Sequence, residues 1–241
     1  MIRAFVEELP EKGTFCLEGE EAFHLIKVKR IRHGETVELL NGKGGRASCY
    51  VNEIKKRVVL LEVSDSQSES PDPPLGLVLG LPVQLSTLST MLPGLVQVGV
   101  THIYLVETEF SGRLRKADKA ISRLDSILKQ SLKQCGRSWL PEIQTLKLID
   151  LVSTLDSTPF GHGHLFHPGG KPWSEIRDKL KMSSPIISFI GPEGGFSPND
   201  LETIESWNTE SIDLGPSILK LETAAVCTLF RLKQELDSLK Q

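Results

Sequence analysis

Residues 185–200 carry the clearest signs of chemistry in this chain of 241 residues. An apolar run at 186–190 leads into the loop Gly191-Pro192-Glu193-Gly194-Gly195, and a helix start with Ser197 as N-cap follows. Glycines let the backbone N–H groups of such a loop approach a ligand closely. The loop lacks the patterns of phosphate and dinucleotide sites, and Glu193 would repel a pyrophosphate and could attract a cation. The segment predicts a binding loop, with a plain tight turn as the alternative.

A second segment, residues 213–225, places charged side chains directly after a strand end. The Gly-Pro pair at 215–216 ends a short strand and starts a helix. Leu214 therefore lies where open α/β sheets bind ligands. Lys220 and Glu222 follow at once. The alternative is a charged pair that is merely solvated on the first turns of a helix.

The pattern after residue 74 supplies the elements that must position these segments. Apolar runs alternate there with helical patterns, as in βα units around a mostly parallel sheet; the runs are LGLVLGL, HIYLVE, HLFH and PIISFI. In residues 116–135, apolar side chains recur every three or four positions, which predicts an amphipathic surface helix. The helix near 218–232 is too widely apolar for one stripe, which indicates two covered sides, and a second subunit could cover the extra one.

The first part of the chain has a different pattern. Residues 64–74 hold no apolar side chain other than proline and predict a solvated linker. Before it come short segments rich in β-branched residues, with a turn signal at Asn41-Gly42. We therefore expect a small β-barrel domain at 1–70 and an α/β domain at 75–241.

Composition excludes several classes of protein. The 28 basic and 31 acidic side chains give a formal charge of −3, and 39% of residues are hydrophobic, which excludes a disordered chain and a uniformly basic nucleic-acid coat. The N-terminus has no apolar core of a signal peptide, so we expect a cytoplasmic protein. Residues 73–106 lack charged side chains, but prolines and glycines interrupt them, so no membrane span is expected.

Two further groups of side chains suggest binding. Lys27, Lys29, Arg30 and Arg32 place four positive charges within six positions, enough to contact RNA phosphates, and we add Arg3 to this candidate RNA-binding set; a solvated strand and turn is the alternative. His162, His164 and His167 are spaced by two and three residues without a neighbouring Cys, Asp or Glu. No metal site is therefore expected.

The two C-terminal segments together carry a family resemblance. GPEGGFS at 191–197, followed by LGPSILKLETA at 214–224, resembles the signature of the ribosomal RNA small subunit methyltransferase E family, which belongs to the SPOUT methyltransferases. The resemblance extends to MIRAFV at the start and to residues 24–45, 107–111 and 134–143, so it covers nearly the whole chain.

The resemblance implies a fold, a cofactor and a reaction. The N-terminal domain would be a PUA-like barrel that holds RNA, and the second a trefoil-knotted α/β methyltransferase domain that binds S-adenosylmethionine at a homodimer interface. The substrate would be N3 of one uridine in 16S ribosomal RNA, as free RNA or within the small ribosomal subunit. The cofactor wall would comprise Leu165, Phe166, His167, Gly191, Pro192, Glu193, Gly194, Gly195, Leu214, Gly215, Ile218 and Leu219. Lys220, Glu222 and Thr223 would lie nearest the transferred methyl group as catalytic candidates.

The chain departs from the family pattern at several positions. Lys220 and Phe110 stand where arginine is common, and the segment around Gln97 lacks the usual acidic residue. A lysine keeps the charge of arginine but not its planar, bidentate fork. Two alternatives therefore stay open: a SPOUT enzyme with another RNA target, and a catalytically silent RNA-binding relative.

Overall fold

The computed structural model describes residues 1–180 and 185–238, with the side chains of 116–122 and 177–180 left out of the description. The chain divides into two compact units, Met1–Pro71 with Lys129–Leu140, and Asp72–Leu128 with Pro141–Gln241. The sequence predicts domains at 1–70 and 75–241, and residues 129–140 fall in the first of these units although they lie within the range predicted for the second domain. Those residues join the first unit because Leu132 and Leu140 pack with Phe5 and Leu40.

A five-stranded sheet forms the first unit, in the order β1-β3-β4-β5-β2. Its strands are β1 (Ile2–Phe5), β2 (Gly13–Leu17), β3 (Thr36–Leu40), β4 (Gly45–Ile54) and β5 (Val59–Ser68). β1 runs parallel to β3, and the other pairs are antiparallel. β1 and β2 are the two edges of the paired strands, so the hydrogen-bonded ladder does not close into the predicted barrel within this described unit.

The predicted turn between β3 and β4 is confirmed, whereas the predicted linker is partly strand. The Asn41 side chain accepts hydrogen bonds from the N–H groups of Lys43 and Gly45, both at 2.9 Å. β5 continues through Ser68, because Gly45 to Ser48 of β4 supply its hydrogen-bond partners. Its polar side chains are exposed there, so the composition resembles that of a linker although the backbone is paired.

A short helical segment follows β2 in the first unit. Helix α1 (Gly19–Phe23) continues into a π-helical turn, His24–Lys29, and Arg30 ends it with a φ of 54°. Leu25 and Ile31 anchor the segment in the core of the unit. The basic cluster thus lies on a helical turn and the loop after it, and not on the strand that the alternative reading assumed.

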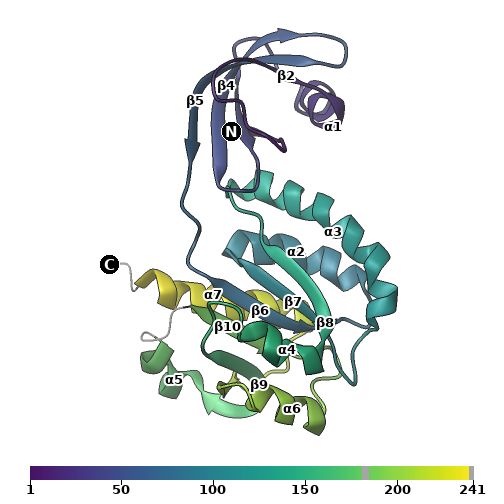
Figure 1. The fold of residues 1–241 in the computed structure, drawn as a ribbon, viewed down its shortest axis with the longest axis vertical. Coiled ribbons are helices and arrows are strands. Elements are labelled where there is room, and N and C mark those ends of the chain that lie inside the picture. The colour runs from purple at the N-terminus through teal and green to yellow at the C-terminus, as the bar shows by residue number, and fades with distance from the viewer. Residues whose placement is uncertain (181–184, 239–241) are drawn as a thin grey trace. The chain divides into compact units, whose positions relative to one another are not determined.

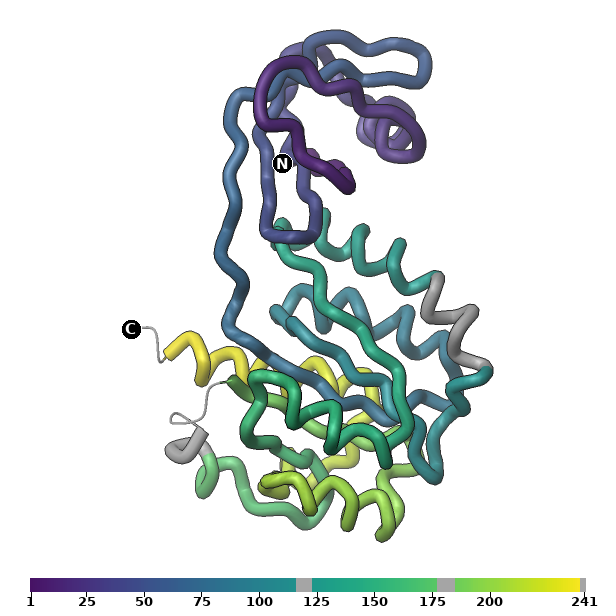
Figure 2. The backbone as a smooth tube through the Cα atoms, viewed as in Figure 1, coloured from purple at the N-terminus to yellow at the C-terminus, as the bar shows by residue number. Residues whose placement is uncertain are grey.

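The second unit is built on a six-stranded sheet in which every adjacent pair is parallel. Its order is β11-β9-β10-β6-β7-β8, and the backbone path between strands can be followed in Figure 2. The strands are β6 (Leu75–Gly80), β7 (His102–Glu107), β8 (Glu142–Lys147), β9 (Gly163–Pro172), β10 (Ile186–Ile190) and β11 (Thr209–Asp213). Strands β6, β7 and β8 follow one another toward one edge of the sheet, whereas β10 pairs with β6 on its other side. A topological switch point therefore lies between β6 and β10.

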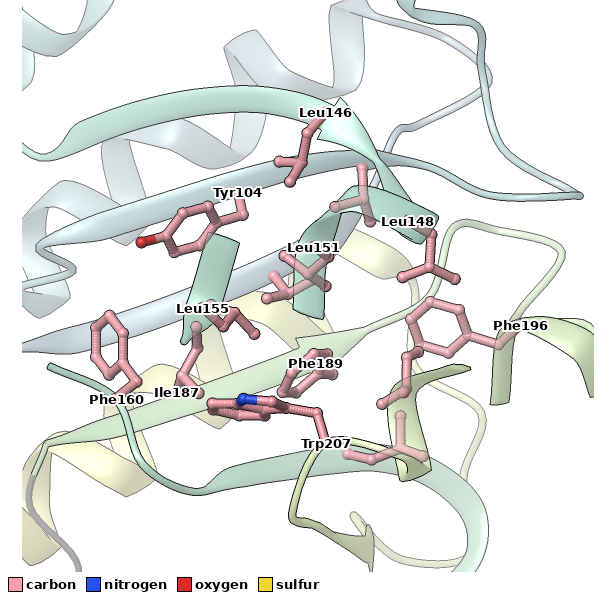
Figure 3. Packing of buried hydrophobic residues seen from close by; sticks show 14 residues of the cluster. Tyr104, Leu146, Leu148, Leu151, Leu155, Phe160, Ile187, Phe189, Phe196 and Trp207 are labelled. Carbon is pink, nitrogen blue, oxygen red and sulfur yellow. The ribbon is translucent and has the colours of Figure 1, made fainter. Parts of the chain in front are cut away.

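Helices cover both faces of this sheet (Figure 1). The helices that follow β6 in the chain are α2 (Ser86–Val98), α3 (Leu114–Cys135), α4 (Leu148–Leu155), α5 (Trp173–Leu180), α6 (Pro198–Glu205) and α7 (Leu221–Ser238), and the end of α3 from Lys129 belongs to the first unit. α7 packs on α2, β6 and β10. On the other face, α4 and α6 enclose an apolar core in which Leu151, Phe189 and Trp207 meet (Figure 3). No helix among the described residues is long and apolar enough to cross a membrane.

The two predicted helices exist, and α7 differs from its prediction in two respects. α3 buries Leu124, Leu128 and Leu132 along one stripe, as the sequence predicts, whereas the side chain of Ala120 lies outside the described residues. α7 buries one side within its own chain, but the Phe230 side chain is 53% exposed. The helix also begins at Leu221, and the residues from Leu214 to Lys220 lie exposed before it.

Candidate functional site

A pocket of about 360 Å³ lies at the carboxyl ends of β9, β10 and β11. Both C-terminal motifs of the sequence contribute to it. Its lining consists of Phe166, His167, Pro168, Ile190, Gly191, Pro192, Glu193, Gly195, Phe196, Asp213, Leu214, Gly215, Pro216, Ser217, Ile218, Leu219, Leu221 and Ala224. This edge, beside the switch point between β6 and β10, is where open α/β sheets bind ligands.

Glycines shape the loop that follows β10. Gly195 adopts a φ of 73°, a left-handed conformation that disfavours other residues, and its N–H donates to the Pro192 carbonyl at 2.8 Å. Gly80, the last residue of β6, allows the loop to come close, because a Cβ there would lie 2.5 Å from the Pro192 nitrogen. The loop is therefore a tight turn pressed against β6, and its backbone lines the pocket.

The helix after the loop begins as the sequence predicts. The Ser197 hydroxyl accepts a hydrogen bond from the Asp200 N–H at 3.2 Å, and the Asp200 carboxylate accepts one from the Ser197 N–H at 2.9 Å. This capping box fixes the start of α6. Asp200 also accepts from the N–H of Glu109 at 3.4 Å, so the loop after β7 is tied to the same point.

Glu193 connects the glycine loop to the loop after β6. Its carboxylate accepts a hydrogen bond from the Val83 N–H at 3.0 Å. Glu193 is also one of the residues that line the pocket, so its negative charge lies close to the ligand site. This position agrees with the expectation that the loop attracts a cationic group and repels a pyrophosphate.

Asp213 stabilises the pocket wall opposite the glycine loop. Its carboxylate accepts hydrogen bonds from the N–H groups of Gly215 at 2.7 Å and Gly169 at 3.0 Å. These two bonds lower the pKa of Asp213, so the group is held as a carboxylate. It joins the end of β11 to a stretch of β9 where the pairing register shifts, and Phe166, His167 and Pro168 of that stretch line the pocket.

The pocket gathers ten of the twelve residues predicted for the cofactor wall. Leu165 does not line this pocket, since its side chain is buried in the core on the α4 and α6 side, and successive residues of a strand face opposite sides. Gly194 does not line the pocket either, because it faces outward against Phe110. Sequence reasoning missed Asp213, Pro168 and Ala224, although Asp213 begins the second motif and an Asp two residues before a glycine is a turn signal.

The three catalytic candidates lie outside this pocket. Lys220 is exposed just before α7. Glu222 and Thr223 line a separate groove between α2 and α7, together with Gly94 and Cys227. Leu221 and Ala224 of the same helix face the cofactor pocket instead. Within one chain, Glu222 and Thr223 therefore lie on a different face of α7 from the side that lines the pocket.

The predicted RNA-binding residues divide into two groups. Lys27, Lys29, Arg30 and Arg32 are exposed, and none of the four forms an ion pair with another described residue. Arg3 forms the second group, and its role in RNA binding stays a prediction. Its guanidinium donates to Glu38 at 2.6 Å and to the carbonyl of Lys133 at 3.0 Å, so its charge is used inside the first unit.

The three histidines are not brought together at one point. His167 lines the pocket, whereas His164 is buried, and neither of its ring nitrogens has a hydrogen-bond partner among the described residues. The pKa of His164 is lowered to about 3, mainly by burial and also by the neighbouring His162, while Glu210 opposes this shift. The described residues contain no group of three side chains able to hold a metal ion.

Comparisons with known proteins identify the family. Residues 68–233 match the RNA methyltransferase domain, and residues 17–64 match the RNA methyltransferase PUA domain. Ribosomal RNA small subunit methyltransferase E of Helicobacter pylori is 30% identical over 93% of this chain and 96% of its own length. Its Bacillus subtilis counterpart is 24% identical over 100% of this chain and 99% of its own length.

A solved structure confirms the predicted fold class. Ribosomal RNA small subunit methyltransferase E of Neisseria gonorrhoeae, solved with S-adenosylmethionine bound, superposes with a TM-score of 0.83 at 23% identity and covers 97% of both chains. The α/β domain with a PUA-like domain before it is therefore the fold of these SPOUT-type enzymes. The chain belongs to the ribosomal RNA small subunit methyltransferase E family of RNA methyltransferases.

Proposed function

We propose that this protein transfers the methyl group of S-adenosylmethionine to N3 of one uridine in 16S ribosomal RNA of the small subunit. The observation that carries the proposal is the pocket at the carboxyl ends of β9 to β11, which both family motifs line. Relatives that match nearly the whole chain are named as small-subunit ribosomal RNA methyltransferases, and the Neisseria gonorrhoeae relative binds S-adenosylmethionine.

The lining residues fit S-adenosylmethionine. A volume of about 360 Å³ lies within the range of small-molecule sites. Apolar side chains such as Phe166 and Leu219 suit an adenine ring, and the backbone of the glycine loop offers amides to its edge. Among the described residues, neither a lysine nor an arginine lines the pocket, whereas Glu193 and Asp213 do, which favours a ligand with a positive sulfonium over a phosphate.

The proposed methyl transfer depends more on the alignment of the methyl donor with N3 of uracil than on a reactive side chain. When bound, S-adenosylmethionine supplies an activated methyl group. The two pocket walls, braced through Glu193 and Asp213, hold the donor in one orientation, and fixed orientation is a large source of rate acceleration. N3 lies on the Watson–Crick edge of uracil, so the uridine must be unpaired or flipped to reach the site. Lys220 would stabilise negative charge on the uracil oxygens after N3 loses its proton.

A homodimer is part of the proposal, because one chain leaves the site open. Ile218 lines the pocket and is 96% exposed, and Leu214 and Leu219 beside it are also exposed. Apolar side chains clustered at the mouth of a pocket are typical of a protein interface. A second copy packed there would close the pocket and would bring its own Lys220, Glu222 or Thr223 toward the reacting atoms.

Substrate binding would rest on the first unit. Lys27, Lys29, Arg30 and Arg32 present positive charge on one helical turn and its following loop, without an ion pair to any other described residue. Contacts between such side chains and phosphates release counterions, which makes affinity fall with salt. The double change of Arg30 and Arg32 to alanine should therefore weaken RNA binding and flatten its salt dependence.

The test is methyl transfer to small ribosomal subunits that lack the modification. Wild-type protein with methyl-labelled S-adenosylmethionine should yield 3-methyluridine on nucleoside mass spectrometry. Glu222→Ala should yield much less, while Glu205→Ala, an exposed glutamate on α6, should match wild type. Another methylated nucleoside would mean a different RNA target. Cofactor binding without transfer to any RNA would mean a silent relative.

A further inference from the structure

The turn after β7 is fixed by an unusual number of hydrogen bonds for an exposed loop. The Ser111 hydroxyl accepts from the Thr108 N–H at 2.8 Å and lies within hydrogen-bond distance of the carbonyls of Thr108 and Gly112. The Gly112 N–H donates to the Leu81 carbonyl at 2.9 Å. With the bond from Glu109 to Asp200, these contacts tie the turn to the loop after β6 and to the start of α6.

Phe110 lies at the tip of this turn. Its side chain is 48% exposed, so a fixed backbone holds an aromatic ring in contact with solvent. Burying such a ring would be favourable by about 2 kcal/mol, so local packing does not explain its position. The ring is pre-organised, because the turn that carries it is already ordered.

Phe110 is also adjacent to the cofactor loop. A Cβ on Gly194 would lie 3.1 Å from the Cβ of Phe110, so the absence of a side chain at Gly194 makes room for this contact. The neighbours of Gly194 on both sides, Glu193 and Gly195, line the pocket. Phe110 therefore stands on the outer surface of the same loop whose inner surface is the pocket wall.

We propose that Phe110 is a substrate-positioning platform on which an unpaired base of the RNA stacks beside the cofactor pocket. The inference rests on the proposed function, since it names how the RNA is held at that site. Aromatic side chains bind unpaired bases by stacking, and the contact is possible for every base. A rigid, solvent-facing ring at the edge of the pocket has the chemistry that a splayed-out base requires.

The experiment compares aromatic side chains at position 110 with leucine, which is non-aromatic and of similar size. Phe110→Leu should raise the KM for unmodified small subunits, and the dissociation constant for them, about tenfold, whereas Phe110→Tyr should stay within about twofold of wild type. Affinity for S-adenosylmethionine, the thermal midpoint and the oligomeric state should be unchanged in both variants. In Phe110→Trp, RNA binding should quench the emission of the new indole.

The readouts separate failure of this inference from failure of the proposed function. Equal KM and equal dissociation constants for wild type and Phe110→Leu would overturn the platform, whether or not methyl transfer occurs. If wild type transfers no methyl group but Phe110→Leu alone loses RNA affinity, the platform stands and the proposed reaction fails. A change of oligomeric state in Phe110→Leu would show that a second copy covers the ring, which also overturns the proposal.

Discussion

Arg3 offers the sharpest test of how the charges of the first unit are used. The sequence places it among the RNA-binding candidates, whereas the structure pairs it with Glu38, whose side chain is only 7% exposed. Arg3 also donates to the carbonyls of Lys133 at 3.0 Å and Gln134 at 3.3 Å, near the end of α3. We predict that Arg3→Ala destabilises the first unit and leaves RNA affinity nearly unchanged.

The magnitude follows from the contacts that are lost. A hydrogen bond to a charged group contributes about 1.5 to 3 kcal/mol, and the two bonds to carbonyls add to this. Arg46 remains near Glu38 at 3.5 Å and the Arg3 side chain is 22% exposed, so the carboxylate is not left wholly unpaired and water can reach it. We therefore expect Arg3→Ala to lower the free energy of unfolding by about 3 kcal/mol. The double variant Arg3→Ala/Glu38→Ala should lose less than the sum of the single variants.

Hydrogen exchange read by mass spectrometry is the suitable assay, because two units need not unfold together. Protection should fall in residues 36–40 and 129–140 and stay unchanged in β6 and β10. Arg30→Ala is the matched control. It should keep wild-type protection and reduce the salt slope of RNA binding by about 1. If Arg3→Ala keeps wild-type hydrogen-exchange protection and reduces the salt slope of RNA binding as Arg30→Ala does, then Arg3 contacts RNA and does not stabilise the first unit.

Two more predictions concern the second unit. The pKa of His164 is lowered to about 3, so between pH 6.5 and pH 3 the unfolded chain binds a proton that the folded chain does not, and stability falls as pH decreases through this window. From pH 7.5 to pH 5 this group alone should remove about 2 kcal/mol, and urea unfolding of His164→Leu should lack that loss; equal pH dependence in both proteins would contradict it. Gly80→Ala would bring a Cβ within 2.5 Å of the Pro192 nitrogen and should lower the affinity for S-adenosylmethionine at least about fivefold by calorimetry, whereas Gly161→Ala, with no atom within 4 Å, should be neutral.

The structural features that the sequence predicts best are those that depend on residues close together in the chain. The strands β6 and β10 are buried at every position, and their largely apolar runs predict them directly. The glycine loop and the capping box at Ser197 are also local, since each arises from residues within about one turn of one another. Ten of the twelve cofactor-wall residues meet in one pocket because both motifs follow strand ends at the same edge of the sheet.

The features that the sequence does not predict depend on distant partners. A charge at position 3 is compatible with RNA or with an ion pair, and only the fold brings Glu38 beside it. Residues 129–140 join the first unit through Leu132 and Leu140, although they lie far along the chain from Phe5. The face of the sheet on which the Leu165 side chain lies depends on the alternation of side chains along its strand. A shift of one residue would move that side chain to the other face.

The directions in which the side chains of α7 point link the catalytic candidates to the oligomeric state. Successive helical residues are rotated by about 100°, so Leu221 and Ala224 can face the pocket only if Glu222 and Thr223 face elsewhere. The helix starts at Leu221, which fixes this phase, and the structure directs Glu222 to the groove beside α2. A single chain therefore cannot present Glu222 to a ligand in its own pocket without rewinding the helix. If Glu222 acts on the reacting atoms, it acts on those held by a second copy, and the catalytic role and the homodimer must then stand or fall together.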